Sequence, residues 1–191
     1  MQVIAGKARR LLLKTLPGME TRPTSNRIKE TLFNILQPYV QGCRFLDLFA
    51  GCGGIGIEAL SRGAREAYFV EKNRKAVRII EENLVHTKLR ESATVWETDA
   101  LAAIRRLNRP GNVFDIIFLD PPYDAGMEKP VLEMLENCAA VSGDTLIIVE
   151  AKIDNDLAAV LPASFEITRE KKYKNNKHVF IRKKEAVREE E

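Results

Sequence analysis

Short apolar runs alternate along this chain with longer segments in which apolar residues recur every three or four positions. The first pattern is typical of strands buried on both faces of a sheet, and the second is typical of helices that pack on such a sheet. Regular alternation of the two predicts an α/β fold with a mostly parallel sheet. The strand patterns lie at 45–49, 67–70, 93–96, 114–119 and 144–150, and the helix patterns between them lie at 57–62, 73–88, 100–107 and 131–138.

Both ends of the alternating region predict further elements. Before the first strand we expect a helix that is capped by Thr24 or Ser25 and ended by Pro38. Three segments follow the last parallel strand, namely a short helix at 154–161 and strands at 165–171 and 178–183. Because the connection between these two strands is short, we expect an antiparallel hairpin. The predicted fold is therefore a seven-stranded sheet that closes with an antiparallel pair, unlike an ordinary dinucleotide-binding fold.

A glycine-rich turn follows the first predicted strand. Gly51, Gly53 and Gly56 form a Gly-x-Gly-x-x-Gly pattern at the start of the next helix. Glycine permits a tight turn and lets a ligand approach the backbone closely. Glu71 ends the second strand, twenty residues after Gly51, where its carboxylate can accept hydrogen bonds from a ribose diol. This pattern predicts a nucleoside-containing ligand across the carboxyl ends of two parallel strands.

Asp47 indicates which nucleoside is bound. A carboxylate just before the glycine turn repels a pyrophosphate and attracts the ammonium group of a methionine moiety. We therefore expect S-adenosylmethionine as the cofactor rather than NAD or FAD. Asp99 follows the third strand, and two roles stay open for it. It can accept from the adenine amino group, with the Ala100 backbone beside it, or it can cap the helix at 100–107.

The fourth strand ends in Asp120-Pro121-Pro122-Tyr123. Two prolines fix the backbone and remove two N–H donors, so the groups left beside the carboxylate can only accept hydrogen bonds. Such acceptors suit an exocyclic amine on a purine, because holding its two hydrogens turns the nitrogen lone pair towards an electrophile. Tyr123 can stack on the base. We expect these four residues to be catalytic, without a metal, on a base that is single-stranded or flipped out.

Composition is that of an ordinary globular protein, with 191 residues, 45% hydrophobic and 30% charged. The chain shows no signal-peptide pattern and no long apolar stretch, so we expect a cytoplasmic protein. Its cysteines number three, are widely spaced and form no Cys-x-x-Cys pair. They argue against a disulfide framework or a zinc site.

Positive charge is concentrated at the two ends of the chain. Residues 1–30 hold seven Lys or Arg against two acids, and residues 165–184 hold eight against two. Either run alone is a solvated face more often than not, but two of them around a nucleoside-cofactor fold favour nucleic acid as a partner. In the first run, residues 1–16 predict a short hairpin whose tip presents Lys7, Arg9 and Arg10 to phosphate.

Taken together, these motifs resemble those of class I amino-group methyltransferases. They are, in chain order, Asp47-Leu48-Phe49-Ala50-Gly51-x-Gly53, Glu71, Asp99-Ala100 and Asp120-Pro121-Pro122-Tyr123. The segments Thr21–Ser25 and Glu30–Leu36 narrow the resemblance to RsmD-type methyltransferases, which modify guanine N2 in bacterial 16S ribosomal RNA. The resemblance runs from Gly6 to about Arg182. It implies a Rossmann-like class I methyltransferase fold, and a 16S rRNA substrate in a partly assembled small subunit.

The resemblance also implies roles for individual residues. Asp120, Pro121 and Tyr123 hold and stack the base, with Pro122 completing the catalytic turn. The residues expected to bind the cofactor are Arg22, Thr24, Asp47, Phe49, Gly51, Gly53, Glu71, Lys72, Asp99 and Ala100. We expect a monomer with an RNA-contacting extension at 1–20, a methyltransferase domain at 21–184 and a charged tail at 185–191.

Two other functions remain compatible with the sequence. The catalytic tetrapeptide is shared with adenine-N6 methyltransferases, so the identity of the base rests on the amino-terminal resemblance. A DNA enzyme of that kind would usually need a separate segment to read base edges, and 191 residues leave little room for one. The second alternative is a non-catalytic assembly factor that binds RNA, against which the intact tetrapeptide argues.

Overall fold

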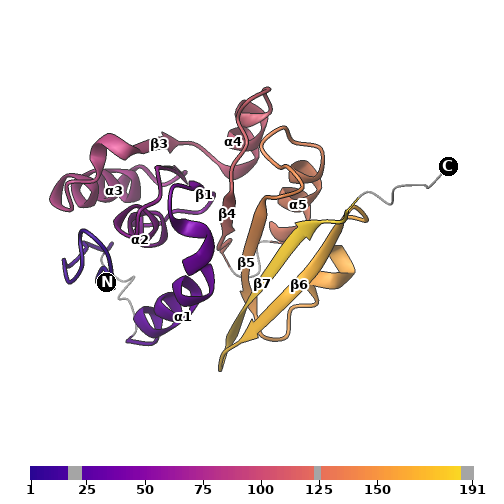
Figure 1. Ribbon diagram of the computed structural model, residues 1–191, viewed down its shortest axis with the longest axis horizontal. Coiled ribbons are helices and arrows are strands. Elements are labelled where there is room, and N and C mark those ends of the chain that lie inside the picture. The colour runs from indigo at the N-terminus through magenta and orange to yellow at the C-terminus, as the bar shows by residue number, and fades with distance from the viewer. Residues whose placement is uncertain (17–22, 123–125, 186–191) are drawn as a thin grey trace.

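The computed structural model describes residues 1–16, 23–122 and 126–185, the first three residues of the second range by their backbone only. Its centre is a seven-stranded sheet of order β3-β2-β1-β4-β5-β7-β6 (Figure 1). The first five strands are parallel, β7 is antiparallel to β5, and β6 is antiparallel to β7. The predicted fold is confirmed. The strands are β1 Arg44–Asp47, β2 Glu66–Glu71, β3 Ala93–Glu97, β4 Ile116–Leu119, β5 Leu146–Lys152, β6 Phe165–Lys172 and β7 Asn176–Lys183.

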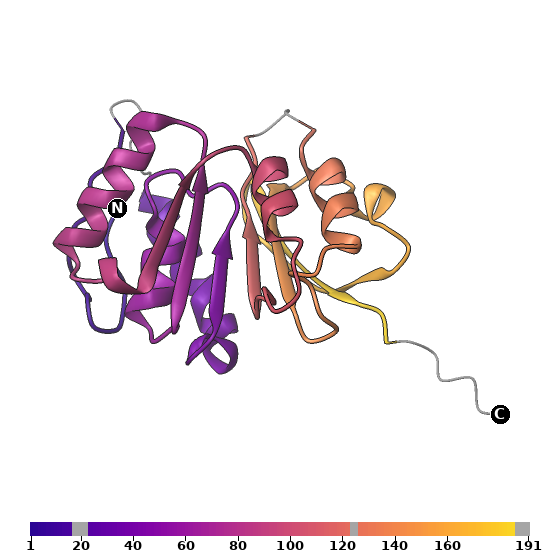
Figure 2. The ribbon, with the colours of Figure 1, turned by 90° about the horizontal axis from the view of Figure 1, so that it is seen from above.

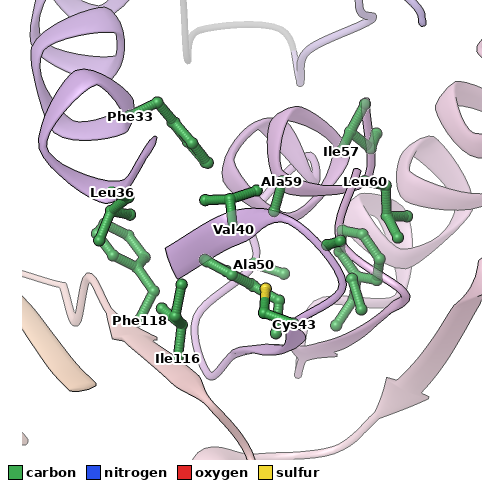
Figure 3. Packing of buried hydrophobic residues seen from close by; sticks show 14 of the residues in the cluster. Phe33, Leu36, Val40, Cys43, Ala50, Ile57, Ala59, Leu60, Ile116 and Phe118 are labelled. Atoms are coloured by element: carbon green, nitrogen blue, oxygen red, sulfur yellow. The ribbon is translucent and has the colours of Figure 1, made fainter. Parts of the chain in front are cut away.

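Helices cover both faces of this sheet (Figure 2). The core on one face is built by α1, α2 and α3, and the core on the other by α4, α5 and the 3-10 helix η2. Figure 3 shows side chains of α1 and α2 packing with Ile116 and Phe118 of β4 in the first core. The helices are α1 Pro23–Val40, α2 Gly54–Ser61, α3 Arg74–His86, α4 Ala100–Leu107, α5 Glu128–Glu136, η1 Arg90–Ser92 and η2 Leu157–Val160.

Three boundary predictions are wrong. The first helix begins at Pro23, so Thr24 and Ser25 lie inside it and do not precede it as caps. Proline suits the first helical position, since its missing N–H would have no partner there. Pro38 does not end this helix, which continues to Val40. Because Pro38 is close to the carboxyl end of the helix, it removes one backbone hydrogen bond without disrupting the earlier turns. The helix expected at 154–161 is only the short 3-10 helix η2.

The amino-terminal segment forms the predicted hairpin, closed by an antiparallel bridge between Gln2 and Leu12. Its buried side chains Val3, Ala8 and Leu13 belong to the core on the α1–α3 face. The hairpin lies along α2. Met1 packs on Gly54 at the start of this helix, whereas a Cβ on Gly6 would lie 1.8 Å from the Ser61 carbonyl oxygen at its end. The hairpin is therefore packed along a full helix.

Glu58 joins the hairpin to α1 and α2. Its carboxylate accepts hydrogen bonds from the backbone N–H groups of Ile4 and Ala5. The same carboxylate pairs with Arg62 at 2.7 Å and with Lys29 of α1 at 3.2 Å, and Glu58 itself is fully buried. Burial lowers the pKa of Lys29, against the opposing effect of the Glu58 charge. A buried charge is tolerable only when it is paired in this way.

Within the residues that the structure describes, no helix is both long enough and apolar enough to span a bilayer.

Candidate active site

The acidic residues singled out in the sequence lie at one edge of the sheet. Asp47 and Glu71 end β1 and β2, and Asp120 follows the last residue of β4. Strands β1 and β4 are neighbours in the sheet. From β1 the chain adds β2 and β3 on one side, and from β4 it adds β5 on the other, so the strand order reverses between β1 and β4. Open α/β sheets bind ligands at such a switch point. The sequence prediction that these groups share the carboxyl edge is confirmed.

The three carboxylates also point to the same face of the sheet. Side chains two positions apart on a strand lie on the same side. In each strand the residue two positions earlier is a phenylalanine that belongs to the core beneath α1, α2 and α3. These phenylalanines are Phe45, Phe69 and Phe118. The strand register places Asp47 level with Phe69 and Phe118, so Glu71 and Asp120 lie two residues further along their strands than Asp47 does.

Asp47 is a buried carboxylate without a hydrogen-bond partner in the described part of the chain. The residue is 1% exposed, and neither of its carboxylate oxygens forms a hydrogen bond to any described residue. Burial raises its pKa to about 7, and the charge of Glu71 adds to this rise. The N–H groups of Phe49 and Gly56 act in the opposite direction, although they fall short of hydrogen-bond geometry with the oxygens. Leaving a buried acceptor unpaired is costly, so this carboxylate suits a cationic ligand.

The glycine turn is shaped for close approach of a ligand. Gly51 has a φ of +54°, and a Cβ added there would meet no described atom within 4 Å. The Gly51 N–H donates to Glu71 Oε2 at 2.9 Å, so the end of β2 holds the turn in place. Gly56 has a different role, because a Cβ there would lie 2.4 Å from the Phe69 ring. It lets α2 pack closely on β2.

Asp99 has one of its two expected roles in the structure. Its Oδ1 accepts from the backbone N–H of Ala102 at 2.9 Å, so the residue caps α4. The side chain remains exposed, and its contact with adenine stays a prediction. Ala100 is the first residue of α4, a position whose N–H has no acceptor within the helix. Both residues lie next to the end of β2, since Thr98 N–H donates to the Glu71 carbonyl.

Asp120 stands next to further acids at the end of β4. Its pKa is raised well above the ordinary range, first by desolvation, then by the charges of Glu150 and Asp47. The residue is nevertheless exposed, so water screens part of these effects. Pro121 is buried and Pro122 is exposed. The turn thus places an accessible acceptor on a proline-fixed backbone.

One functional candidate was missed in the sequence. Ile148 of β5 pairs with Phe118 of β4. Glu150 and Asp120 each lie two residues further along, so they are beside each other. The Glu150 carboxylate bonds to Asn176 and His178 of β7. An acid at the end of the predicted strand 144–150 was the available signal, by the same rule that selected Glu71. Its partners could not be predicted, because they depend on the antiparallel register of β5 and β7.

Comparison with known proteins places this site in a family. A family model described as Conserved hypothetical protein 95 matches residues 1–182. The chain belongs to this family. Ribosomal RNA small subunit methyltransferase D of Escherichia coli strain K12 is 35% identical over 173 residues, which cover 90% of this chain and 84% of that protein. The Haemophilus influenzae protein of the same name is 35% identical over 90% of this chain and 88% of its own length.

A solved structure of a hypothetical protein from Thermus thermophilus has the same fold as this family member. The two match with a TM-score of 0.80 at 29% identity, over 94% of this chain and 98% of that one. The resemblance to methyltransferases of the RsmD type, expected from the motifs, is confirmed.

The structure does not place several of the predicted site residues beside the carboxylates. Arg22 and Tyr123 lie outside the described residues, as does the side chain of Thr24. Phe49 packs against the core on the α4–α5 face, so its ring points away from the carboxylates. Lys72 directly follows Glu71 and is exposed. Gly53 has a φ of +84° and packs on Ile57 and Ile80.

The basic hairpin tip lies at the opposite edge of the sheet from the carboxylates. Lys7, Arg9 and Arg10 are exposed, as predicted for a surface that contacts RNA. Lys7 lines an open pocket together with Gly42, Gly63 and Arg65. These residues precede β1 and β2, so the pocket is at the amino ends of the strands. The structure therefore does not place Lys7 next to Asp120.

Proposed function

We propose that this protein transfers a methyl group from S-adenosylmethionine to the exocyclic N2 amino group of a guanine in 16S ribosomal RNA. The observation that carries the proposal is the unpaired, buried carboxylate of Asp47 on β1, beside the Asp-Pro-Pro turn after β4. The first group suits the cationic end of the cofactor, and the second suits an amine. Their strands are adjacent, so donor and acceptor would meet at one place.

The residues present fit S-adenosylmethionine. Asp47 would hold the ammonium group of its methionine moiety, which supplies the missing partner for a buried acceptor. Gly51 leaves open space above the backbone for the ligand. Glu71 would accept from the ribose diol with lone pairs left over from its bonds to the N–H groups of Gly51 and Asn73. No phosphate has to approach these acids.

When bound, S-adenosylmethionine supplies a methyl group activated by a positively charged sulfonium. The protein's part is to orient the amine. Asp120 and the carbonyl of Pro121 would accept the two amino hydrogens, which directs the nitrogen lone pair towards that methyl group. The carboxylate of Asp120 would also stabilise the positive charge that develops on nitrogen. Tyr123 would stack on the base and fix its plane.

The relatives support ribosomal RNA as the substrate. The Escherichia coli protein is named a ribosomal RNA small subunit methyltransferase, and this chain matches most of its length. The exposed Lys7, Arg9 and Arg10 would contact phosphates around the target. We further propose that the protein acts as a cytoplasmic monomer on a partly assembled small subunit, in which the target guanine is still accessible.

Methyl transfer from labelled S-adenosylmethionine tests this proposal. The substrates are small ribosomal subunits, partly assembled subunits, naked 16S RNA and DNA, with nucleoside analysis of the product. We expect N2-methylguanine in the ribosomal RNA and its loss in Asp120→Ala. Asp144→Ala is a matched control, because Asp144 is an exposed acid at the other end of the sheet.

Each other outcome contradicts the proposal in a specific way. N6-methyladenine in DNA would assign the protein to the adenine-N6 class. RNA binding that Asp120→Ala leaves unchanged, with no product from the wild type on any substrate, would indicate a non-catalytic assembly factor.

A further inference from the structure

Glu150 and Asp120 are neighbouring residues on adjacent parallel strands. Phe118 pairs with Ile148 and Leu119 with Val149, so one further step along each strand brings Asp120 level with Glu150. Backbones of adjacent strands lie about 4.8 Å apart, and side chains at the same level point to the same side. Two carboxylates therefore stand side by side at this edge of the sheet.

Side chains of β7 fix the carboxylate of Glu150 in place. Its Oε1 accepts from Asn176 Nδ2 at 2.6 Å, and its Oε2 lies 3.1 Å from His178 Nε2. A carboxylate only accepts, so Nε2 carries the hydrogen, and in the neutral ring Nδ1 is left to accept from the Tyr173 hydroxyl at 3.1 Å. His178 is 1% exposed and its ring packs edge-on against Phe118 of β4.

The charged groups around the two acids come from five elements. Asp47 faces Asp120 from β1, with Glu71 behind it on β2. Lys152 lies two residues beyond Glu150 on β5. Behind Glu150, Lys177 of β7 is paired with Glu170 of β6 at 2.9 Å, and Arg169 of β6 lies near enough to Tyr173 to lower its pKa. Burial and the Glu150 charge outweigh that effect and raise the pKa of Tyr173 to about 12, so its hydroxyl stays a donor.

We propose that Glu150, held by His178 and Asn176, is a positioning residue that sets the charge state of Asp120. Its fixed negative charge makes Asp120 more basic than an isolated aspartate at a strand end. A more basic carboxylate accepts more strongly from an amine. It is also better able to take up the surplus proton when the new N–C bond forms and the C–S bond breaks with its electron pair on sulfur.

Two consequences follow for the pH dependence. The pKa of Asp120 is raised, by desolvation first and by Glu150 second, so Asp120 loses its proton at a higher pH than usual. Removing the Glu150 charge lowers that pKa, and the carboxylate of Asp120 then persists to lower pH. The role of Glu150 in the reaction rests on the proposed function, whereas its effect on Asp120 does not.

Carbon NMR of labelled aspartate carboxyl groups measures the effect directly. The Asp120 resonance is assigned with Asp120→Asn and titrated in the wild type and in Glu150→Gln. We expect the midpoint to fall by roughly 0.5 to 1 pH unit in Glu150→Gln, as for two like charges about 5 Å apart that are largely screened by water. Glu136→Gln on α5 is the control and leaves the midpoint unchanged. An unchanged midpoint in folded Glu150→Gln overturns the proposal.

A second measurement covers the case in which Glu150→Gln does not fold. In the wild type, the Asp120 resonance should titrate over a wider pH range than a single-step curve, because its proton is coupled to the neighbouring acids. A single-step curve for Asp120 would overturn the proposal.

Activity then separates this inference from the proposed function. The acidic limb of the methyl-transfer profile should move to lower pH in Glu150→Gln, whereas a uniform fall at every pH would mean a merely structural role. A shifted NMR midpoint with no methyl transfer by the wild type would refute the proposed function and leave the coupling of the two acids intact.

Discussion

Lys29 Nζ lies 3.2 Å from Glu58 Oε2, with only 3% and 0% of the two side chains exposed. This pair joins α1 to α2, and Glu58 also anchors the backbone of Ile4 and Ala5 in the amino-terminal hairpin. Lys29 in turn donates to the Gln2 carbonyl. The hairpin, α1 and α2 therefore depend on one buried carboxylate.

Replacing Glu58 should strongly destabilise the fold. Glu58→Gln leaves the ammonium of Lys29 buried without a counter-charge, and breaking a buried pair in this way costs about 3–5 kcal/mol. Urea denaturation measures the loss in the free energy of unfolding. Glu82→Gln is the control, because Glu82 pairs with Lys14 on the surface and is 53% exposed. Such exposed pairs contribute about 0–1 kcal/mol, so equal losses in the two variants would contradict the assigned role of Glu58.

Stability should depend on pH through Asp47. Its folded pKa is about 7 against an ordinary value of 3.8, so the folded state binds the proton more tightly than the unfolded state. The contribution of Asp47 is therefore most favourable below about pH 4, declines as pH rises to about 7 and is then constant, a loss of about 4 kcal/mol at most. Asp47→Asn lacks this decline. Denaturation of both proteins between pH 4 and 8 should show their difference moving in favour of the variant, while Asp144→Asn follows the wild type.

Cofactor affinity should depend on the same group with the opposite sign. A cationic ligand prefers the ionised carboxylate, so below about pH 7 binding of S-adenosylmethionine must first remove the proton from Asp47. We expect the affinity measured by calorimetry to fall by up to about tenfold per pH unit below that midpoint. Asp47→Asn should bind weakly at every pH. An affinity that is flat from pH 5 to 8 would show that Asp47 does not contact the cation.

The hairpin tip should affect RNA binding and leave the cofactor site unchanged. Changing Lys7, Arg9 and Arg10 together to Gln removes up to three phosphate contacts, so the slope of log affinity against log salt should decrease by about two to three. S-adenosylmethionine affinity should be unaffected, because the tip lies at the other edge of the sheet. Arg105, Arg109 and Lys129, changed together to Gln, give an equal loss of charge on the α4–α5 side. Equal effects of the two triple variants would mean that only net charge matters.

Periodicity predicted the order of strands and helices because each parallel strand is a continuous apolar run and each helix covers one apolar face. It also placed Asp47, Glu71 and Asp120 at one edge, since parallel strands share their carboxyl ends. The rule that proline ends a helix failed at Pro38. This residue is so close to the end of α1 that its missing hydrogen bond affects only the last turn.

Long-range packing was beyond the reach of the sequence. Glu58 lies in a predicted helix and has the character of a surface acid, but it is buried because the hairpin folds over it from more than fifty residues away. The pairing of Glu150 with His178 likewise requires the register between β5 and β7. Neither contact can be predicted from the local pattern of apolar and polar residues.

Under the proposed function, the separation between the basic tip and the carboxylates sets a minimum size for the substrate. The two lie at opposite edges of the sheet, and its longest parallel strand, β5, has seven residues, a span of about 23 Å at ~3.3 Å per residue. A short oligonucleotide that places its base at Asp120 cannot also reach Lys7. A larger folded RNA can contact both edges at once. The protein would therefore bind a structured RNA more tightly than a short single strand that carries the same base.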